Sequence, residues 1–281
     1  MNEELSFFLY KKAGLALESC PIEQAHIIVL GIPFDSTQTG GTGSRYGPTS
    51  IRLASYELEH YDFSTDTDLS DIMLADIGDI DCVPGSATLT LERLESTLSY
   101  IPSDTFLISL GGEHSVSTPI VKYLSPDMVV SFDAHPDLRN SYMGNEDSHS
   151  SVMRRIHESG KDITLIGVRE GSKEEHDYAI ENNIHIYGAE NCNDVKLPCG
   201  KRIYISIDLD VFESYMNVGN PVPGGMQFND VCSKLSTLFR DNDVCGVDIV
   251  ELCSIGPDNS AMVAAKLLFK IIAYHKTHEK K

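Results

Sequence analysis

Short apolar runs alternate with longer amphipathic stretches along nearly the whole chain. Runs rich in Ile, Val, Leu and Phe are typical of strands buried on both faces, as in a parallel sheet. This pattern predicts strands at residues 25–34, 73–80, 105–110, 128–134, 163–168, 184–187, 203–211 and 244–251.

The stretches between these runs carry apolar residues at helical spacing. Ser86 is a suitable N-cap for the first predicted helix, and Gly160 a suitable stop for the second. Helices are predicted at residues 87–101, 148–160, 172–183, 230–240 and 259–275. Alternating strands and helices without a repeat or a linker favour one doubly wound α/β domain over residues 1–281, with a mostly parallel sheet.

The charge of the chain excludes some functions. There are 42 acidic residues against 22 Lys and Arg, a formal net charge of −20, which argues against a nucleic-acid partner and is compatible with a cationic substrate. No apolar run is long enough to span a membrane, and the start Met-Asn-Glu-Glu lacks the basic segment of a secretory signal. The 7 cysteines form no C-x-x-C pair, so we expect free, buried thiols and a cytoplasmic protein.

The most informative motif is Asp133-Ala-His-Pro-Asp137, directly after an apolar run. If the strand continues through it, Asp133, His135 and Asp137 share one face. Unpaired ionisable groups at the end of a buried strand are costly to desolvate, and a bound cation removes that cost. The motif therefore predicts a cation site.

A second apolar run leads into Asp208-Leu-Asp210, and a third into Gly111-Gly-Glu-His-Ser115, which presents His114. The carboxyl ends of the strands of a doubly wound sheet lie at one edge, so these residues are expected to meet. Carboxylates with one or two imidazoles suit Mn²⁺ better than Zn²⁺. Two such ions can lower the pKa of a shared water and so produce a hydroxide nucleophile at neutral pH. Such a site therefore predicts a hydrolase.

Two further residues are candidates for contact with substrate. His149 stands at a helix start shortly after the first motif and could move protons, although a surface histidine is the simpler interpretation. Glu251 ends a buried strand and could bind a guanidinium group, either of a substrate or of an arginine in the chain.

Together these motifs resemble the ureohydrolase family, the arginases and agmatinases. The resemblance follows family order through nearly the whole chain, in Thr39-Gly-Gly-Thr-Gly-Ser-Arg-Tyr-Gly-Pro48, Ile51-Arg52, Asp76-Ile-Gly-Asp79, Gly111-Gly-Glu-His-Ser115, Asp133-Ala-His-Pro-Asp137, Ser148-His-Ser150, Ser206-Ile-Asp-Leu-Asp210, Pro221-Val-Pro-Gly-Gly225 and Asp248-Ile-Val-Glu251. It implies a three-layer α/β/α sandwich with a mostly parallel sheet, in agreement with the pattern above.

The resemblance also implies two manganese ions per subunit. One would be bound by His114, Asp133, Asp137 and Asp208, and the other by His135, Asp133, Asp208 and Asp210. His149 matches the family's proton-shuttle histidine, and Glu251 the carboxylate that holds the guanidinium. We further predict that Asp137 passes a proton to the leaving amine. The family usually forms trimers or hexamers, so a homo-oligomer is implied.

The segment from Arg139 to Ser148 bears on the substrate. Its pattern looks more like bacterial and archaeal agmatinases than arginases, so we predict hydrolysis of agmatine to putrescine and urea, with Arg139 at the substrate. An arginase or guanidinobutyrase remains an alternative, as does an internal salt bridge for Arg139. Gly40, Gly41 and Gly43 lack the dinucleotide spacing G-x-G-x-x-G and are expected in an entrance loop.

Two rival classes predict different features. A two-metal phosphatase would need basic groups to bind phosphate, and Lys and Arg do not gather around these motifs. A non-catalytic family member would be expected to lack ligands, and all six positions carry suitable residues here.

Overall fold

The computed structural model describes residues 5, 8–11 and 13–278. The ends of the predicted 1–281 domain and the Met-Asn-Glu-Glu start lie outside these residues. Within the described residues, nine strands form one sheet in the order β1-β5-β2-β6-β11-β10-β7-β8-β9, parallel except for the antiparallel edge pair β1 and β5. The strands are β1 (Leu9–Tyr10), β2 (Ile27–Ile32), β5 (Leu74–Ile80), β6 (Phe106–Gly111), β7 (Met128–Phe132), β8 (Asp162–Gly167), β9 (His185–Gly188), β10 (Arg202–Asp208) and β11 (Asp243–Val250).

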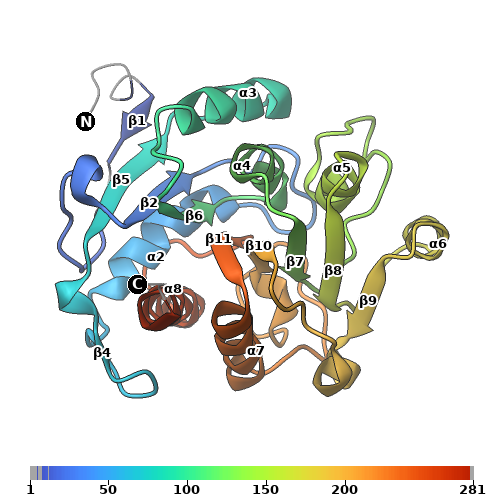
Figure 1. The fold of residues 1–281 in the computed structure, drawn as a ribbon. Coiled ribbons are helices and arrows are strands. Elements are labelled where there is room, and N and C mark those ends of the chain that lie inside the picture. Colours follow the sequence, from blue (N-terminus) through green and yellow to red (C-terminus); the bar gives the residue numbers. More distant parts are fainter. Residues whose placement is uncertain (1–4, 6–7, 12, 279–281) are drawn as a thin grey trace.

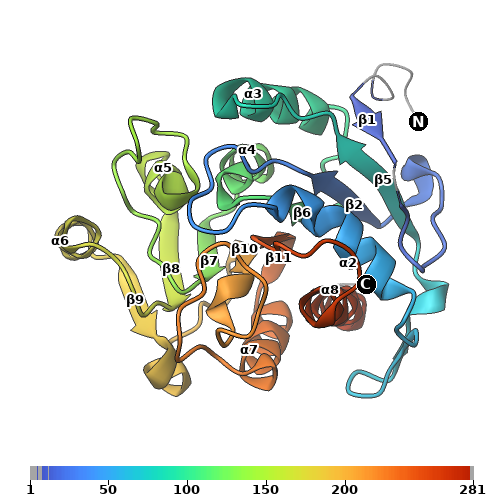
Figure 2. The same cartoon turned by 180° about the vertical axis from the view of Figure 1, so that it is seen from behind.

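Helices cover both faces of the sheet, which confirms the three-layer α/β/α fold (Figures 1 and 2). One face carries α3, α4 and α5, the other carries α2, α7 and α8, and α6 lies beside the β9 edge. The helices are α2 (Gly47–Ser55), α3 (Ala87–Leu98), α4 (Ser117–Leu124), α5 (Val152–Glu158), α6 (Lys173–Glu181), α7 (Phe228–Asp241) and α8 (Asn259–His278). Within the described residues, no helix is both long and apolar enough to cross a membrane.

The two faces of the sheet contribute to separate cores, as strand alternation requires. In β2, Ile27 and Val29 join the core under α2, α7 and α8, whereas Ile28, Leu30 and Ile32 join the core under α3, α4 and α5. The unbroken apolar runs in the sequence arise because both faces of these strands are covered.

Most predicted elements are present with shifted ends. Ser86 caps α3 as predicted, since its hydroxyl accepts a hydrogen bond from the Leu89 amide at 3.3 Å. Two helices, α2 and α4, were not predicted, nor was the hairpin of β3 (Tyr61–Asp62) and β4 (Thr67–Asp68). All seven cysteines are free as expected, but only Cys192, Cys232 and Cys245 are buried. The prediction of buried thiols is wrong for the half-buried Cys20, Cys82 and Cys253 and for the exposed Cys199.

Candidate metal centre and substrate pocket

The predicted site residues come from four neighbouring strands at one edge of the sheet. The strands β6, β11, β10 and β7 lie side by side in this order in the sheet. His114 follows β6, Glu251 follows β11, Asp208 ends β10, and Asp133 follows β7. The close approach that presents His114 depends on Gly112, because a Cβ there would lie 1.9 Å from the Phe34 carbonyl oxygen. The expected meeting of these motifs is therefore observed.

Strand alternation is not what brings the first motif together, so that part of the prediction is wrong. Strand β7 ends at Phe132, and Asp133 to Asp137 form an irregular turn beyond it. Asp137 has a left-handed backbone, with φ of 50°. The strand predicted to run through residue 211 likewise ends at Asp208, and Asp210 lies in a 3₁₀ turn. The direction of these carboxylates is therefore set by turns at the strand ends, and not by the alternation of side chains along a strand.

The first group of ligand atoms surrounds the His114 ring. Its Nδ1 lies 2.9 Å from Asp137 Oδ2, 3.2 Å from Asp133 Oδ2 and 3.6 Å from Asp208 Oδ2. The Nε2 of the same ring is 2.8 Å from the Ser206 hydroxyl, which donates to Asp248 at 2.6 Å. Because Ser206 gives its proton to Asp248, it accepts one from His114 Nε2, so Nδ1 is the nitrogen that faces the carboxylates and would give its lone pair to a bound ion.

The second group surrounds His135. Its Nδ1 lies 2.8 Å from Asp210 Oδ2 and 3.6 Å from Asp133 Oδ1. Backbone amides hold the carboxylates in place: His135 N donates to Asp133 Oδ1 at 2.6 Å, Ala134 N to Asp210 at 2.9 Å, and Asp210 N to Asp208 at 2.9 Å. Asp133 belongs to both groups, as a residue bridging two ions would.

The side chains fit divalent cations. His114, Asp133 and Asp137 offer ligand atoms within 4.8 Å of one another, as do Asp133, His135 and Asp210. Within the described part of the chain, the buried atoms His114 Nδ1 and Asp133 Oδ2 have no hydrogen-bond partner. Orphaned atoms of this kind are rare in protein interiors. Carboxylate oxygens with two imidazoles form a donor set suited to Mn²⁺.

Repulsion within this group changes its protonation. Burial and the neighbouring Asp210 and Asp133 raise the pKa of Asp208 well above its usual range. Burial and Asp133 raise the pKa of Asp137 to about 7. Although burial opposes it, Asp133 and Asp210 raise the pKa of His135 to about 11. The protein alone thus holds protons where divalent cations would neutralise the same carboxylates.

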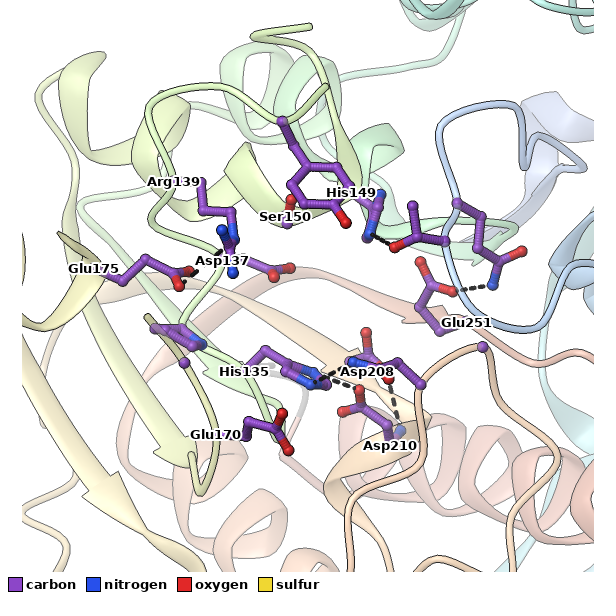
Figure 3. Close-up of a pocket in the computed structure, with 17 residues that line it drawn as sticks. His135, Asp137, Arg139, His149, Ser150, Glu170, Glu175, Asp208, Asp210 and Glu251 are labelled. Atoms are coloured by element: carbon purple, nitrogen blue, oxygen red, sulfur yellow. Dashed lines mark hydrogen bonds and ion pairs between the residues drawn. The ribbon is translucent and has the colours of Figure 1, made fainter. Parts of the chain in front are cut away.

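Glu251 and His149 face the ligands across a cavity of about 170 Å³ (Figure 3). Glu251 is buried and also has a left-handed backbone, with φ of 68°. It accepts hydrogen bonds from His114 N at 2.9 Å and from the Gln38 side chain at 2.5 Å. Burial and Glu113 raise its pKa well above the usual range, which a guanidinium partner would reverse.

His149 opens a 3₁₀ turn before α5 and lines the same cavity. Its ring lies between the hydroxyls of Thr37 and Thr39, each 3.3 Å from one ring nitrogen. Burial first, and then the charges of His114 and His135, lower its pKa to about 4. The ring is therefore neutral at physiological pH, with one nitrogen protonated and the other carrying a lone pair.

Arg139 lines the same cavity, and Figure 3 shows it beside Glu175. Its Nε is 3.7 Å from Glu175, and its guanidinium lies 5.3 Å from the centroid of the Tyr142 ring. The salt bridge within the chain, predicted above as the alternative role of Arg139, is therefore present. Arg139 nevertheless also lines the cavity.

Sequence reasoning missed several residues of the cavity wall. Gln38 and Thr39 belong to the expected entrance loop, but their contacts with Glu251 and His149 were not predicted. Asn220, whose amide lies 2.9 Å from His135 Nε2, and Glu170 were also missed as wall residues. Single polar residues in loops give no periodic signal by which to find them.

Known proteins resemble the chain over almost its full length. A family model described as the Arginase family matches residues 25–273. An N(1)-aminopropylagmatine ureohydrolase of Thermococcus kodakarensis is 40% identical over 276 residues, covering 93% of this chain and 96% of the relative. An agmatinase of Pyrococcus horikoshii is 37% identical over 276 residues, covering 94% of this chain and 97% of the relative.

A solved structure shows the same fold. An agmatine ureohydrolase of Thermoplasma volcanium superposes with a TM-score of 0.85 at 34% identity, covering 99% of both chains. Family match, sequence identity and fold agree. The chain therefore belongs to the arginase family and is an agmatinase-like ureohydrolase that hydrolyses C–N bonds of amidines.

Proposed function

We propose that this site cleaves the guanidinium group of a linear guanidino amine and releases urea. Agmatine, which would give putrescine, is the first candidate substrate. The observation that carries the proposal is the buried carboxylate of Glu251 facing a cavity whose far wall is formed by the candidate metal ligands. The net charge of −20 would favour the approach of a cationic substrate.

We propose Mn²⁺ as the cofactor, with His114, Asp133, Asp137 and Asp208 holding one ion and His135, Asp133, Asp208 and Asp210 holding the other. Two divalent ions at these residues would supply a hydroxide nucleophile, because they lower the pKa of a shared water toward about 7. The proton on His114 Nε2, held by Ser206, keeps Nδ1 free for the first ion.

Three residues of the chain would act on the substrate. Glu251 would hold the guanidinium group in line with the ligands through paired hydrogen bonds. Asp137, whose carboxyl lines the cavity, would pass a proton to the leaving amine. His149, neutral at physiological pH, would exchange protons between the cavity and solvent.

A second candidate substrate is N(1)-aminopropylagmatine, which carries a longer amine tail. Two observations favour it: the name of the Thermococcus kodakarensis relative, and a second hollow of about 400 Å³ next to the cavity. Pro136, Glu170 and Gly171 line both spaces. The exposed carboxylate of Glu170 has no ion pair within the described residues, so an ammonium group of the tail could bind there.

We propose Arg139 as the residue that distinguishes substrate tails. Its positive charge faces the cavity, only partly offset by Glu175 at 3.7 Å. A tail that ends in a carboxylate, as in arginine or 4-guanidinobutyrate, would be attracted by the charge of Arg139. An amine tail would instead be attracted by the charge of Glu170.

The experiment is a comparison of urea release by the Mn²⁺-loaded protein from agmatine, N(1)-aminopropylagmatine, arginine and 4-guanidinobutyrate. We expect higher kcat/KM for the two amines than for the two acids. Glu170→Gln should lower kcat/KM for the longer amine by roughly twofold to fivefold, as expected for one exposed ion pair. Glu181→Gln, which removes an exposed charge outside the cavity, is the matched control.

Faster turnover of the acids would overturn the assignment of an amine substrate and make Arg139 the main tail contact. Absence of urea from all four compounds, with manganese bound, would refute the proposed hydrolysis of a guanidino amine.

A further inference from the structure

Glu113 is a fully buried carboxylate, 0% exposed, that none of the roles above uses. It directly precedes His114 but points its oxygens at other partners. Its Oε2 accepts from Thr37 N at 2.7 Å, and its Oε1 accepts from the Ser115 hydroxyl at 2.6 Å and from the Thr37 hydroxyl. Burial raises the pKa of Glu113, and these donors oppose that rise.

Thr37 joins Glu113 to His149. Its hydroxyl oxygen accepts the backbone N–H of His149 at 3.1 Å and lies 3.3 Å from Nδ1 of the same ring. Thr37 thus contacts His149 at both the main chain and the side chain. Tyr142 packs edge-on against the same ring, with ring centroids 5.7 Å apart.

These contacts decide which nitrogen of the neutral ring carries the proton. A hydroxyl has one proton to donate and two lone pairs to accept with. Thr37 donates its proton to Glu113, so both lone pairs face His149. The ring must then donate from Nδ1, and Nε2 is left as an acceptor 3.3 Å from the Thr39 hydroxyl at the cavity wall.

We propose that Glu113 and Thr37 are positioning residues that hold His149 as the Nδ1-protonated tautomer, with Nε2 presented to the cavity as proton acceptor. This inference rests on the proposed function, in which His149 exchanges protons. Without the pair, the ring would keep its place in the turn but lose its fixed tautomer and orientation.

The first test needs no activity. The ring nitrogens of ¹⁵N-histidine-labelled, metal-free protein are observed by NMR at pH 7.5, with His149→Asn used to assign the signal. The wild-type ring should carry its proton on Nδ1. Thr37→Val, which keeps the shape but removes the hydroxyl, should move the ring toward the Nε2-protonated tautomer. Thr37→Ser should restore the Nδ1-protonated form.

The second test is kinetic. Thr37→Val should lower kcat for urea release by roughly tenfold to a hundredfold, a part of the roughly 10²–10⁴-fold that a positioned proton-transfer group contributes. KM and bound manganese should not change, and Thr37→Ser should stay near wild type. Glu113→Gln should follow Thr37→Val, because with its amide oxygen kept on the Thr37 N–H its NH2 group would face the Thr37 hydroxyl, which would then be free to donate to His149 Nδ1. Thr237→Val, on α7, is the control.

A wild-type ring protonated on Nε2 would overturn the proposal, as would an unchanged tautomer in Thr37→Val. If the wild type releases no urea but shows the predicted tautomer and its loss in Thr37→Val, the positioning pair stands and only the proposed function fails.

Discussion

Two groups of largely buried charged side chains differ in how completely their members are partnered. The arginine cluster consists of Arg52, Asp76, Asp79 and Lys11, and the metal-ligand cluster of His114, Asp133, His135, Asp137, Asp208 and Asp210. Arg52 is 1% exposed and donates to Asp76, Asp79 and the Gly78 carbonyl. In the metal-ligand cluster, His114 Nδ1 and Asp133 Oδ2 are left without a hydrogen-bond partner.

The difference separates a structural ionic network from a site that needs a ligand. The arginine cluster contains two cations for two carboxylates, and the outer cation, Lys11, is 3.8 Å from Asp76. The metal-ligand cluster places four carboxylates around two imidazoles, and its carboxyl pKa values are mostly raised. A buried network that cannot neutralise itself is one that added cations complete.

The largest effect is expected from Asp208→Asn. It should lower urea release by roughly a thousandfold or more, because a ligand shared by both proposed ions is lost. The metal-free variant should unfold with a free energy no smaller than wild type, since it removes a carboxyl whose charge is disfavoured by burial and by Asp210. Urea denaturation with chelator present tests the second point. Wild-type activity in Asp208→Asn would break the comparison.

The converse change is Arg52→Met in the arginine cluster. Removing one partner of a buried ion pair should lower the free energy of unfolding by about 3–5 kcal/mol, because Asp76 and Asp79 remain buried. Arg240→Met, which breaks an exposed ion pair with Asp241, is the control and should leave the free energy of unfolding nearly unchanged, because solvent screens that pair. Equal decreases in the free energy of unfolding of the two variants would show that the buried ion pairs of Arg52 stabilise the fold no more than an exposed pair does.

The free energy of unfolding should depend on pH with opposite sign in the metal-free and the manganese-bound protein. In the metal-free protein the raised pKa values of Asp137, about 7, and His135, about 11, mean that the folded chain holds more protons than the unfolded chain. Its free energy of unfolding should therefore fall as pH rises from about 6 to 9, by about 1.4 kcal/mol per pH unit for each extra proton.

With manganese bound, the same free energy should rise over this range, because the ligands bind the ion in their deprotonated forms. Urea denaturation at several pH values, with and without Mn²⁺, measures both slopes. A metal-free protein that gains stability with rising pH would contradict the charge balance described here.

The smallest effect is expected from Lys11→Met. Its ammonium is half-exposed and 3.8 Å from Asp76, so its loss should change the free energy of unfolding by less than about 1 kcal/mol. A loss as large as that of Arg52→Met would show that the arginine cluster depends on both cations.

The sequence predicted the sheet and the location of the site because both follow from periodic or adjacent residues. Apolar runs marked the strands, and the polar motifs after them marked one edge of the sheet. The mechanism inferred for Asp133 to Asp137 was wrong, since a turn with Asp137 at φ of 50° replaces the expected strand. Tertiary contacts between distant loops, such as Thr37 with Glu113 and His149, leave no local pattern and required the structure.

The most direct test of the central claim counts the manganese bound per chain at equilibrium, in wild type and in Asp208→Asn. We predict two ions per wild-type chain and loss of tight binding in the variant, with the fold retained by circular dichroism. A wild-type chain that binds no manganese tightly, or a variant that still binds two ions, would contradict the interpretation of this cluster as a centre completed by divalent cations.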